Sequence, residues 1–89
     1  MFIINMTGQK AKYKTQIDNL TLYANIAKWK YAEGYTLDLW LVKGVNIYDG
    51  YISDLDKKAY FIHYTPTAQQ KRLINVFCRK VAKKENILL

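Results

Sequence analysis

The chain has 89 residues, 51% of them hydrophobic, which suffices for one small domain with a thin core. Fourteen Lys and Arg residues stand against seven Asp and Glu residues, so we expect an anionic partner, nucleic acid before acidic membrane. The single cysteine excludes an intrachain disulfide and a cysteine metal cluster, and no apolar run approaches the roughly 20 residues of a membrane span. The short apolar start lacks the basic region of a signal peptide, so we expect a cytoplasmic protein that does not enter membranes.

The first 15 residues are predicted to be an N-terminal extension, and a helix is predicted over residues 16–33. Thr15 can cap this helix and Gly34 can end it. A second apolar stripe on another side of the helix would need a subunit contact or two-sided packing to be buried. The main face consists of apolar residues that recur at helical spacing: Ile17, Leu20, Tyr23, Ala24, Ala27 and Tyr31.

From residue 35 the hydrophobic pattern changes to the alternation of a β-strand. Leucines alternate over residues 37–41 and point to one face of the predicted strand. Lys43-Gly44 then provides a turn or a kink. Asp49-Gly50 interrupts the next strand as a tight turn, a bulge or a bend. A further strand over residues 59–64 is apolar enough to be buried.

The segment over residues 65–84 fits two structures. As a helix it begins with Thr65 as the cap and Pro66 in the first turn. That helix would have a basic stripe consisting of Arg72, Arg79 and Lys83. As strands, residues 67–72 and 73–78 form two short pieces around a tight bend. The hydrophobic period slightly favours the helix.

Two short blocks follow one another in the order found in a known protein family. The first block is Val42-Lys43-Gly44 followed by Gly50, Ile52 and Asp56, and the second is Gln70-Lys71-Arg72 followed by Leu73-Ile74-Asn75. Over about residues 20–78 the chain resembles Hfq and the other Sm-like RNA-binding proteins.

The resemblance implies a mainly β fold, in which an N-terminal α-helix lies on a strongly bent, five-stranded antiparallel barrel. The Sm-like domain would cover residues 16–80, with residues 81–89 as a basic tail. The gap from Gly44 to Gly50 is one residue longer than is usual in the family, which predicts a bulge near residues 48–49. On this hypothesis residues 66–84 form strands.

The resemblance also implies an RNA chaperone that binds single-stranded RNA on a homo-oligomeric ring, a hexamer, and promotes annealing or regulation. Its cations would neutralise phosphates and its aromatic residue would stack on a base. By position, the proximal face for U-rich RNA would contain Lys57, Lys58, Lys71 and Arg72. The distal face for A-rich RNA would contain Trp40, Gly44, Val45, Asn46 and Ile47. The rim would contain Lys28 and Lys30.

Catalysis, a cofactor and a metal site are not expected. His63 is the only histidine and lies in an apolar strand. Asp54 and Asp56 fit a polar turn with adjacent lysines. The sequence contains no Gly-rich phosphate loop and no nucleophile with a plausible base. We therefore expect binding without covalent chemistry.

A second hypothesis stays open. It describes a small α+β protein of a phage or another mobile element, with a C-terminal helix at 66–84. That protein would bind a host protein and use the helix as a basic amphipathic surface. The two hypotheses disagree about the structure of this segment.

Overall fold

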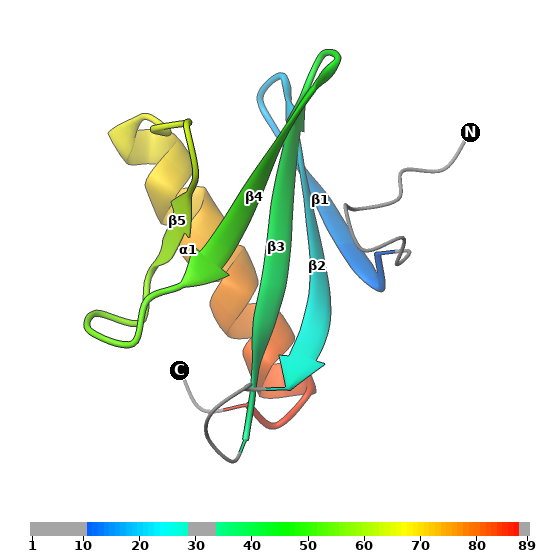
Figure 1. Cartoon of the computed structure of the whole chain (residues 1–89), viewed down its shortest axis with the longest axis vertical. Coiled ribbons are helices and arrows are strands. Elements are labelled where there is room, and N and C mark those ends of the chain that lie inside the picture. The colour runs from blue at the N-terminus through cyan, green and yellow to red at the C-terminus, as the bar shows by residue number, and fades with distance from the viewer. Residues whose placement is uncertain (1–10, 29–33, 88–89) are drawn as a thin grey trace.

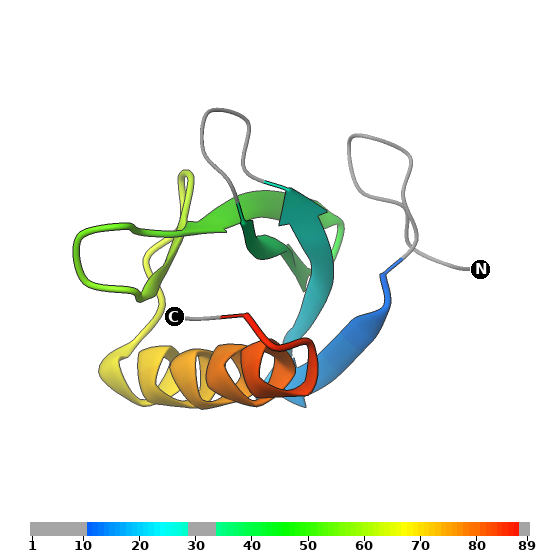
Figure 2. The same cartoon turned by 90° about the horizontal axis from the view of Figure 1, so that it is seen from below.

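The computed structural model describes residues 11–28 and 34–87. One helix, α1 (Ala68–Lys84), crosses one face of a single open sheet (Figure 1). The sheet curls over this helix, so we call the face toward α1 the inner face and the opposite face the outer face (Figure 2). Five antiparallel strands form the sheet in chain order: β1 (Tyr13–Ile17), β2 (Leu20–Lys28), β3 (Tyr35–Lys43), β4 (Asn46–Ile52) and β5 (Ala59–Phe61).

The mainly β character is confirmed and the open sheet has five antiparallel strands, but the helix predicted over residues 16–33 is wrong in its described part. Residues 13–17 and 20–28 are strands, joined by a two-residue turn at Asp18-Asn19. Asp18 has a φ of 52°, a left-handed conformation that Asp tolerates better than most residues. The remaining residues of the predicted helix, 29–33, lie outside the described residues.

The core lies between the inner face and α1. The alternating leucines of β3 point to the inner face as predicted, and each is at most 2% exposed. Ile74, Cys78 and Val81 of α1 belong to the same buried cluster as these leucines. Burial raises the pKa of the Cys78 thiol to about 12, so this cysteine is a packing residue.

The two glycines of the β3–β4 region have different roles. Gly44 has a φ of 60° and forms the predicted turn after β3. Gly50 lies inside β4, where the pairing with β3 is unbroken over residues 46–51, so the bulge predicted near residues 48–49 is absent. A Cβ atom at Gly50 would lie 2.6 Å from the ring of Phe61. Glycine therefore allows β5 to approach β4 closely.

The helix α1 begins with a capping box. The Thr67 hydroxyl accepts a hydrogen bond from the Gln70 backbone N–H at 3.2 Å, and the Thr67 N–H donates to the Gln70 side chain at 2.9 Å. Thr67 therefore takes the cap position predicted for Thr65. This helix confirms the C-terminal helix of the second hypothesis, and the strands that the resemblance implied over residues 67–78 are wrong.

Candidate nucleic-acid interface

Positive charge is concentrated on α1. This helix contains no acidic residue. The other eight basic and seven acidic residues of the chain leave a net charge of only +1. Nearly all of the net charge of +7 therefore resides on one element. Its six basic residues are all exposed: Lys71, Arg72, Arg79, Lys80, Lys83 and Lys84.

One flank of α1 contacts β5. The Asn75 side-chain oxygen accepts a hydrogen bond from the Ala59 backbone N–H at 3.0 Å, which fixes the direction of Asn75 toward the sheet edge. At 3.6 residues per turn, three cations lie within about 60° of Asn75 around the helix axis. They are Lys71, Arg72 and Arg79. These cations therefore lie on the β5 side of the helix.

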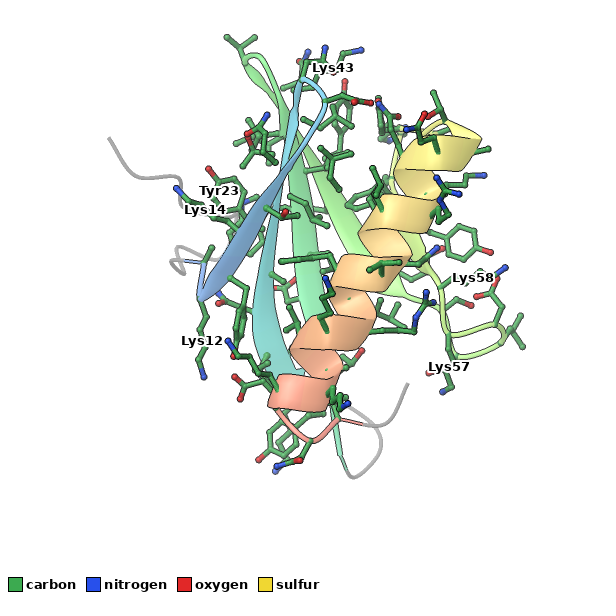
Figure 3. All side chains as sticks on the ribbon, turned by 180° about the vertical axis from the view of Figure 1, so that it is seen from behind. Lys12, Lys14, Tyr23, Lys43, Lys57 and Lys58 are labelled. Carbon is green, nitrogen blue, oxygen red and sulfur yellow. The ribbon has the colours of Figure 1, made fainter. Side chains whose placement is uncertain are left out.

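The loop between β4 and β5 adds two exposed lysines beside this flank, Lys57 and Lys58 (Figure 3). Lys58 immediately precedes Ala59, and its backbone N–H donates to the Asp56 carboxylate at 3.0 Å. The Lys57 ammonium lies 3.9 Å from the Asp54 carboxylate, and both groups are solvent-exposed. The structure thus places the four residues predicted for the proximal face on both sides of the α1–β5 junction. A helix, not strands, positions Lys71 and Arg72.

Two exposed tyrosines lie on the outer face beside this loop. Tyr51 of β4 pairs with Tyr60 of β5, and their rings stack with centroids 6.0 Å apart. They are 51% and 41% exposed, so their surfaces are accessible. The Tyr60 hydroxyl donates to Asp56 and lowers the pKa of that carboxyl below its usual value. Sequence reasoning missed this pair because only the register between β4 and β5 brings the two residues together.

Trp40, predicted to stack on adenine, is completely buried. Its ring stacks on Tyr23 with centroids 5.5 Å apart and planes 12° apart. Its indole Nε1 has no hydrogen-bond partner among the described residues. A base cannot reach this ring without movement of its neighbours. The other predicted distal residues are exposed at or beside the β3–β4 turn: Gly44, Val45, Asn46 and Ile47.

The centre of the outer face contains carboxylates. Asp38 pairs with Tyr51 across β3 and β4, and Asp49 pairs with Trp40. Burial and, to a smaller extent, the charge of Asp49 raise the pKa of Asp38 above its usual value. Carboxylates repel phosphates, so α1, which has no acidic residue, is a better nucleic-acid surface than the centre of the sheet.

The two lysines predicted for the rim lie at the end of β2 and beyond it. Lys28 is exposed at the end of β2, and Lys30 lies outside the described residues. Within residues 11–28 and 34–87, no three His, Cys, Asp or Glu side chains are grouped to hold a metal ion. In the same ranges no helix has the length and apolar character needed to cross a membrane.

Comparison of the chain with protein-family models, with curated proteins and with solved structures gave no match. The resemblance to Hfq and the Sm-like proteins therefore stays a prediction.

Proposed function

We propose that this chain binds single-stranded RNA through the β5 side of α1 and the adjacent loop. We call this surface the basic flank and define it by five residues: Lys57, Lys58, Lys71, Arg72 and Arg79. The observation that carries the proposal is the presence of six exposed cations and no acidic residue on α1. Such one-sided charge suits a polyanion, because each phosphate contact releases condensed counterions.

The two arginines suit phosphate binding best. A guanidinium group presents a planar fork of donors that matches the oxygens of a phosphate. Arg72 and Arg79 are seven residues apart, which separates them by about 10 Å along the helix axis. Lys57 and Lys58 add two exposed cations beyond the helix, where Asp54 and Asp56 of the same loop offset their charge, and a flexible strand can contact both elements.

The exposed tyrosine pair favours a single strand over a duplex. Unpaired bases stack on aromatic side chains, and each such contact contributes about 1–3 kcal/mol. Tyr51 and Tyr60 lie on the strands that flank the loop of Lys57 and Lys58. In our proposal they take the stacking role that the resemblance gave to Trp40.

The homo-oligomeric ring and the annealing activity form a separable part of the proposal. A ring closed by pairing β1 of one copy with β5 of the next would meet an obstacle. The Ala59 N–H already donates to Asn75, and Phe61 already forms a bridge with Tyr64. We therefore propose that any ring forms through other surfaces. Light scattering tests the ring. A hexamer would support it, whereas a monomer that binds RNA would contradict the ring and leave the proposed RNA site unchanged.

The RNA site is tested by fluorescence anisotropy with labelled oligo-U, oligo-A and a duplex RNA at several salt concentrations. We expect the Arg72→Gln/Arg79→Gln variant to lower the salt slope of single-strand binding by about 1.4, or roughly 0.7 for each lost phosphate contact. The matched control is Lys28→Gln/Lys43→Gln, which removes the same charge from strand ends. Equal weakening by both variants would reduce the proposal to nonspecific attraction.

A second candidate function is binding to a host protein. This hypothesis predicted a C-terminal helix at 66–84, and α1 is present there. The charge of α1 would then require an acidic partner surface. The two candidates differ in the role of stacking. Tyr51→Ala/Tyr60→Ala should weaken RNA binding and leave purely electrostatic binding to an acidic protein unchanged.

A further inference from the structure

The outer edge of β1 has backbone groups that no described residue pairs with. Ile17 and Leu20 form the pair that closes the two-residue turn, so they exchange ladder hydrogen bonds. The alternation of an antiparallel ladder then directs the backbone N–H and C=O groups of Lys14 and Gln16 away from β2. Within the described part of the chain these backbone groups have no partner. Among residues 11–28 and 34–87, β1 therefore has a free edge to which another strand can be added.

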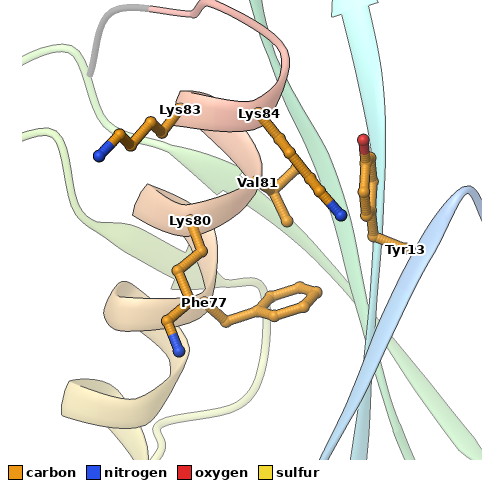
Figure 4. A pocket seen from close by; sticks show the side chains of 6 residues that line it. All are labelled: Tyr13, Phe77, Lys80, Val81, Lys83 and Lys84. Carbon is orange, nitrogen blue, oxygen red and sulfur yellow. The ribbon is translucent and has the colours of Figure 1, made fainter.

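An apolar groove lies beside this edge, between β1 and α1. Its larger compartment has a volume of about 480 Å³, within the usual range of about 300–1,000 Å³ for ligand sites. In Figure 4 the Phe77 ring points across this compartment toward Tyr13, with Lys80 and Lys84 along the helix. A smaller compartment of about 180 Å³ shares Phe77 and Lys80 with the first. Its other lining residues are Thr15, Gln16, Ile17, Leu73 and Val76.

Contacts at both ends hold the two walls of the groove in place. At one end the Gln70 side chain donates to the Asp18 carboxylate at 3.4 Å. At the other end Glu85 accepts hydrogen bonds from Tyr13 and from the Lys12 ammonium, the latter at 2.7 Å. The separation between β1 and α1 is therefore set before any ligand binds, which reduces the entropy lost on binding.

We propose that the groove binds an extended, acidic peptide segment of another protein as a sixth strand on β1. The Lys14 and Gln16 backbone groups would form the ladder with the peptide, a recognised mode of peptide binding. Alternate side chains of an extended strand lie about 6.6–6.8 Å apart on one face. Two successive apolar side chains would therefore enter the two compartments beside Lys80 and Lys84, while the acidic side chains on the opposite face of the added strand meet Lys14.

Charge and backbone chemistry select this occupant. A second copy of the chain pairing through β1 would bring its own Lys14 toward the first Lys14, and like charges across an interface are costly. RNA carries suitable charge but has no alternating amide N–H and C=O groups, so it cannot extend the ladder. An acidic peptide can both pair with the edge of β1 and place its carboxylates beside Lys14. The site is on the opposite flank of α1 from the proposed RNA site and does not depend on it.

Fluorescence anisotropy with a labelled hexapeptide of alternating Leu and Asp tests the site. We expect binding that an alternating Leu and Lys peptide does not reproduce. Lys14→Pro should weaken binding about tenfold or more, because one acceptor of the peptide loses its donor. Its matched control, Lys14→Ala, removes the same charge but retains the N–H and should lose far less affinity. Proline is tolerated on an edge strand where its missing N–H faces outward.

A second pair of variants keeps the test decisive if circular dichroism shows that Lys14→Pro is unfolded. Leu73 lines the smaller compartment and is 40% exposed, so Leu73→Glu should fold and should also weaken peptide binding about tenfold. Gln69→Glu adds the same charge on the exposed side of α1 and should have little effect. Equal affinities within either pair of variants would overturn the proposal.

Two further outcomes would also overturn it. A dimer that disappears in Lys14→Pro would identify a second copy as the occupant of the edge. Loss of the peptide in Arg72→Gln/Arg79→Gln, with Leu73→Glu unaffected, would place the peptide on the basic flank. Failure of RNA binding alone would leave the peptide result unchanged, so the two proposals fail independently.

Discussion

Both outer edges of the sheet have backbone groups that no neighbouring strand pairs with. The two edges differ in whether other residues supply hydrogen bonds to these groups. At β5 the side chain of Asn75 accepts from the Ala59 N–H, and Phe61 bridges to Tyr64. At β1 the outward groups of Lys14 and Gln16 remain unpaired within the described residues. Proteins commonly block or charge such edges to prevent unwanted pairing. Here one edge is blocked, while the other carries Lys14 and adjoins a groove.

This difference indicates how one helix can serve two surfaces. On the β5 side, the hydrogen bond between Asn75 and Ala59 links the middle of α1 to the strand, beside the cations of the basic flank. On the β1 side, hydrogen bonds near both ends of the strand hold it against α1, and an apolar groove remains between them. A rigid charged surface suits a polyanion, whereas an open edge suits an incoming strand.

The largest loss of stability should come from a side chain added at the close contact between β4 and β5. Gly50→Ala places a Cβ atom 2.6 Å from the Phe61 ring and 3.1 Å from the Tyr60 carbonyl oxygen. We expect a loss of about 1–3 kcal/mol in the free energy of unfolding, measured by urea denaturation, because overpacking displaces β5. RNA affinity should fall with it, while the β1 groove keeps its peptide affinity.

Gly44 provides the control for this change. It has a φ of 60°, and a Cβ atom added there would meet nothing within 4 Å, so only backbone strain opposes substitution. Gly44→Asn should change stability by no more than about 0.5 kcal/mol, because Asn tolerates this conformation. A larger loss at Gly44 than at Gly50 would contradict the close approach of β5.

A smaller loss of stability should follow when the hydrogen bond between Asn75 and the β5 edge is removed. Asn75→Ala leaves the partly buried Ala59 N–H without its acceptor and should cost about 1 kcal/mol in urea denaturation. Asn75→Asp retains an acceptor, so it should restore most of the stability. It also adds a negative charge to the basic flank and should weaken RNA binding. If Asn75→Ala is as stable as the wild type, the edge is closed by other contacts.

The smallest change in stability should come from Glu85, which connects the end of α1 to the start of β1. Lys12 and Tyr13 hold the pKa of Glu85 below its usual value of about 4.5. A depressed carboxyl pKa stabilises the fold above the usual pKa, and this stabilisation is lost as the pH falls through the depressed value. The Tm of Glu85→Gln should therefore be slightly lower than that of the wild type at pH 7. The difference should disappear in acid, and a difference that persists there would contradict the contact.

Sequence alternation was sufficient to predict the second half of the sheet but not the first. The strands after residue 35 and the turn at Gly44 follow from alternating residues and a glycine. Leu20, Leu22 and Ala24 alternate as well, yet Leu20 and Ala24 also fit a helical period, so the pattern alone was ambiguous. The Asp18-Asn19 turn was the signal that distinguishes the two structures, because turn residues inside a predicted helix favour a hairpin.

For the C-terminal segment, residues 65–84, the local sequence signals were correct but the resemblance was misleading. Its helical period and its cap were visible in the sequence, since Thr67 and Gln70 stand three residues apart as in a capping box. The resemblance outweighed these local signals and predicted strands. The basic residues at 57, 58, 71 and 72 were predicted as one RNA-binding set, which stays a prediction, and their positions beside the α1–β5 junction depend on the Asn75 contact. That contact and the Tyr51–Tyr60 pair depend on tertiary packing, which composition does not encode.

The order of elements along the chain has a consequence during synthesis. All five strands leave the ribosome before α1, so the leucines of the inner face emerge well before Ile74, Cys78 and Val81 that cover them. At roughly 5–20 residues per second, the sheet spends at least about a second with this apolar face uncovered. Translation pauses within α1 would lengthen that interval, and a nascent chain stalled before residue 74 should bind chaperones more strongly than one released from the ribosome.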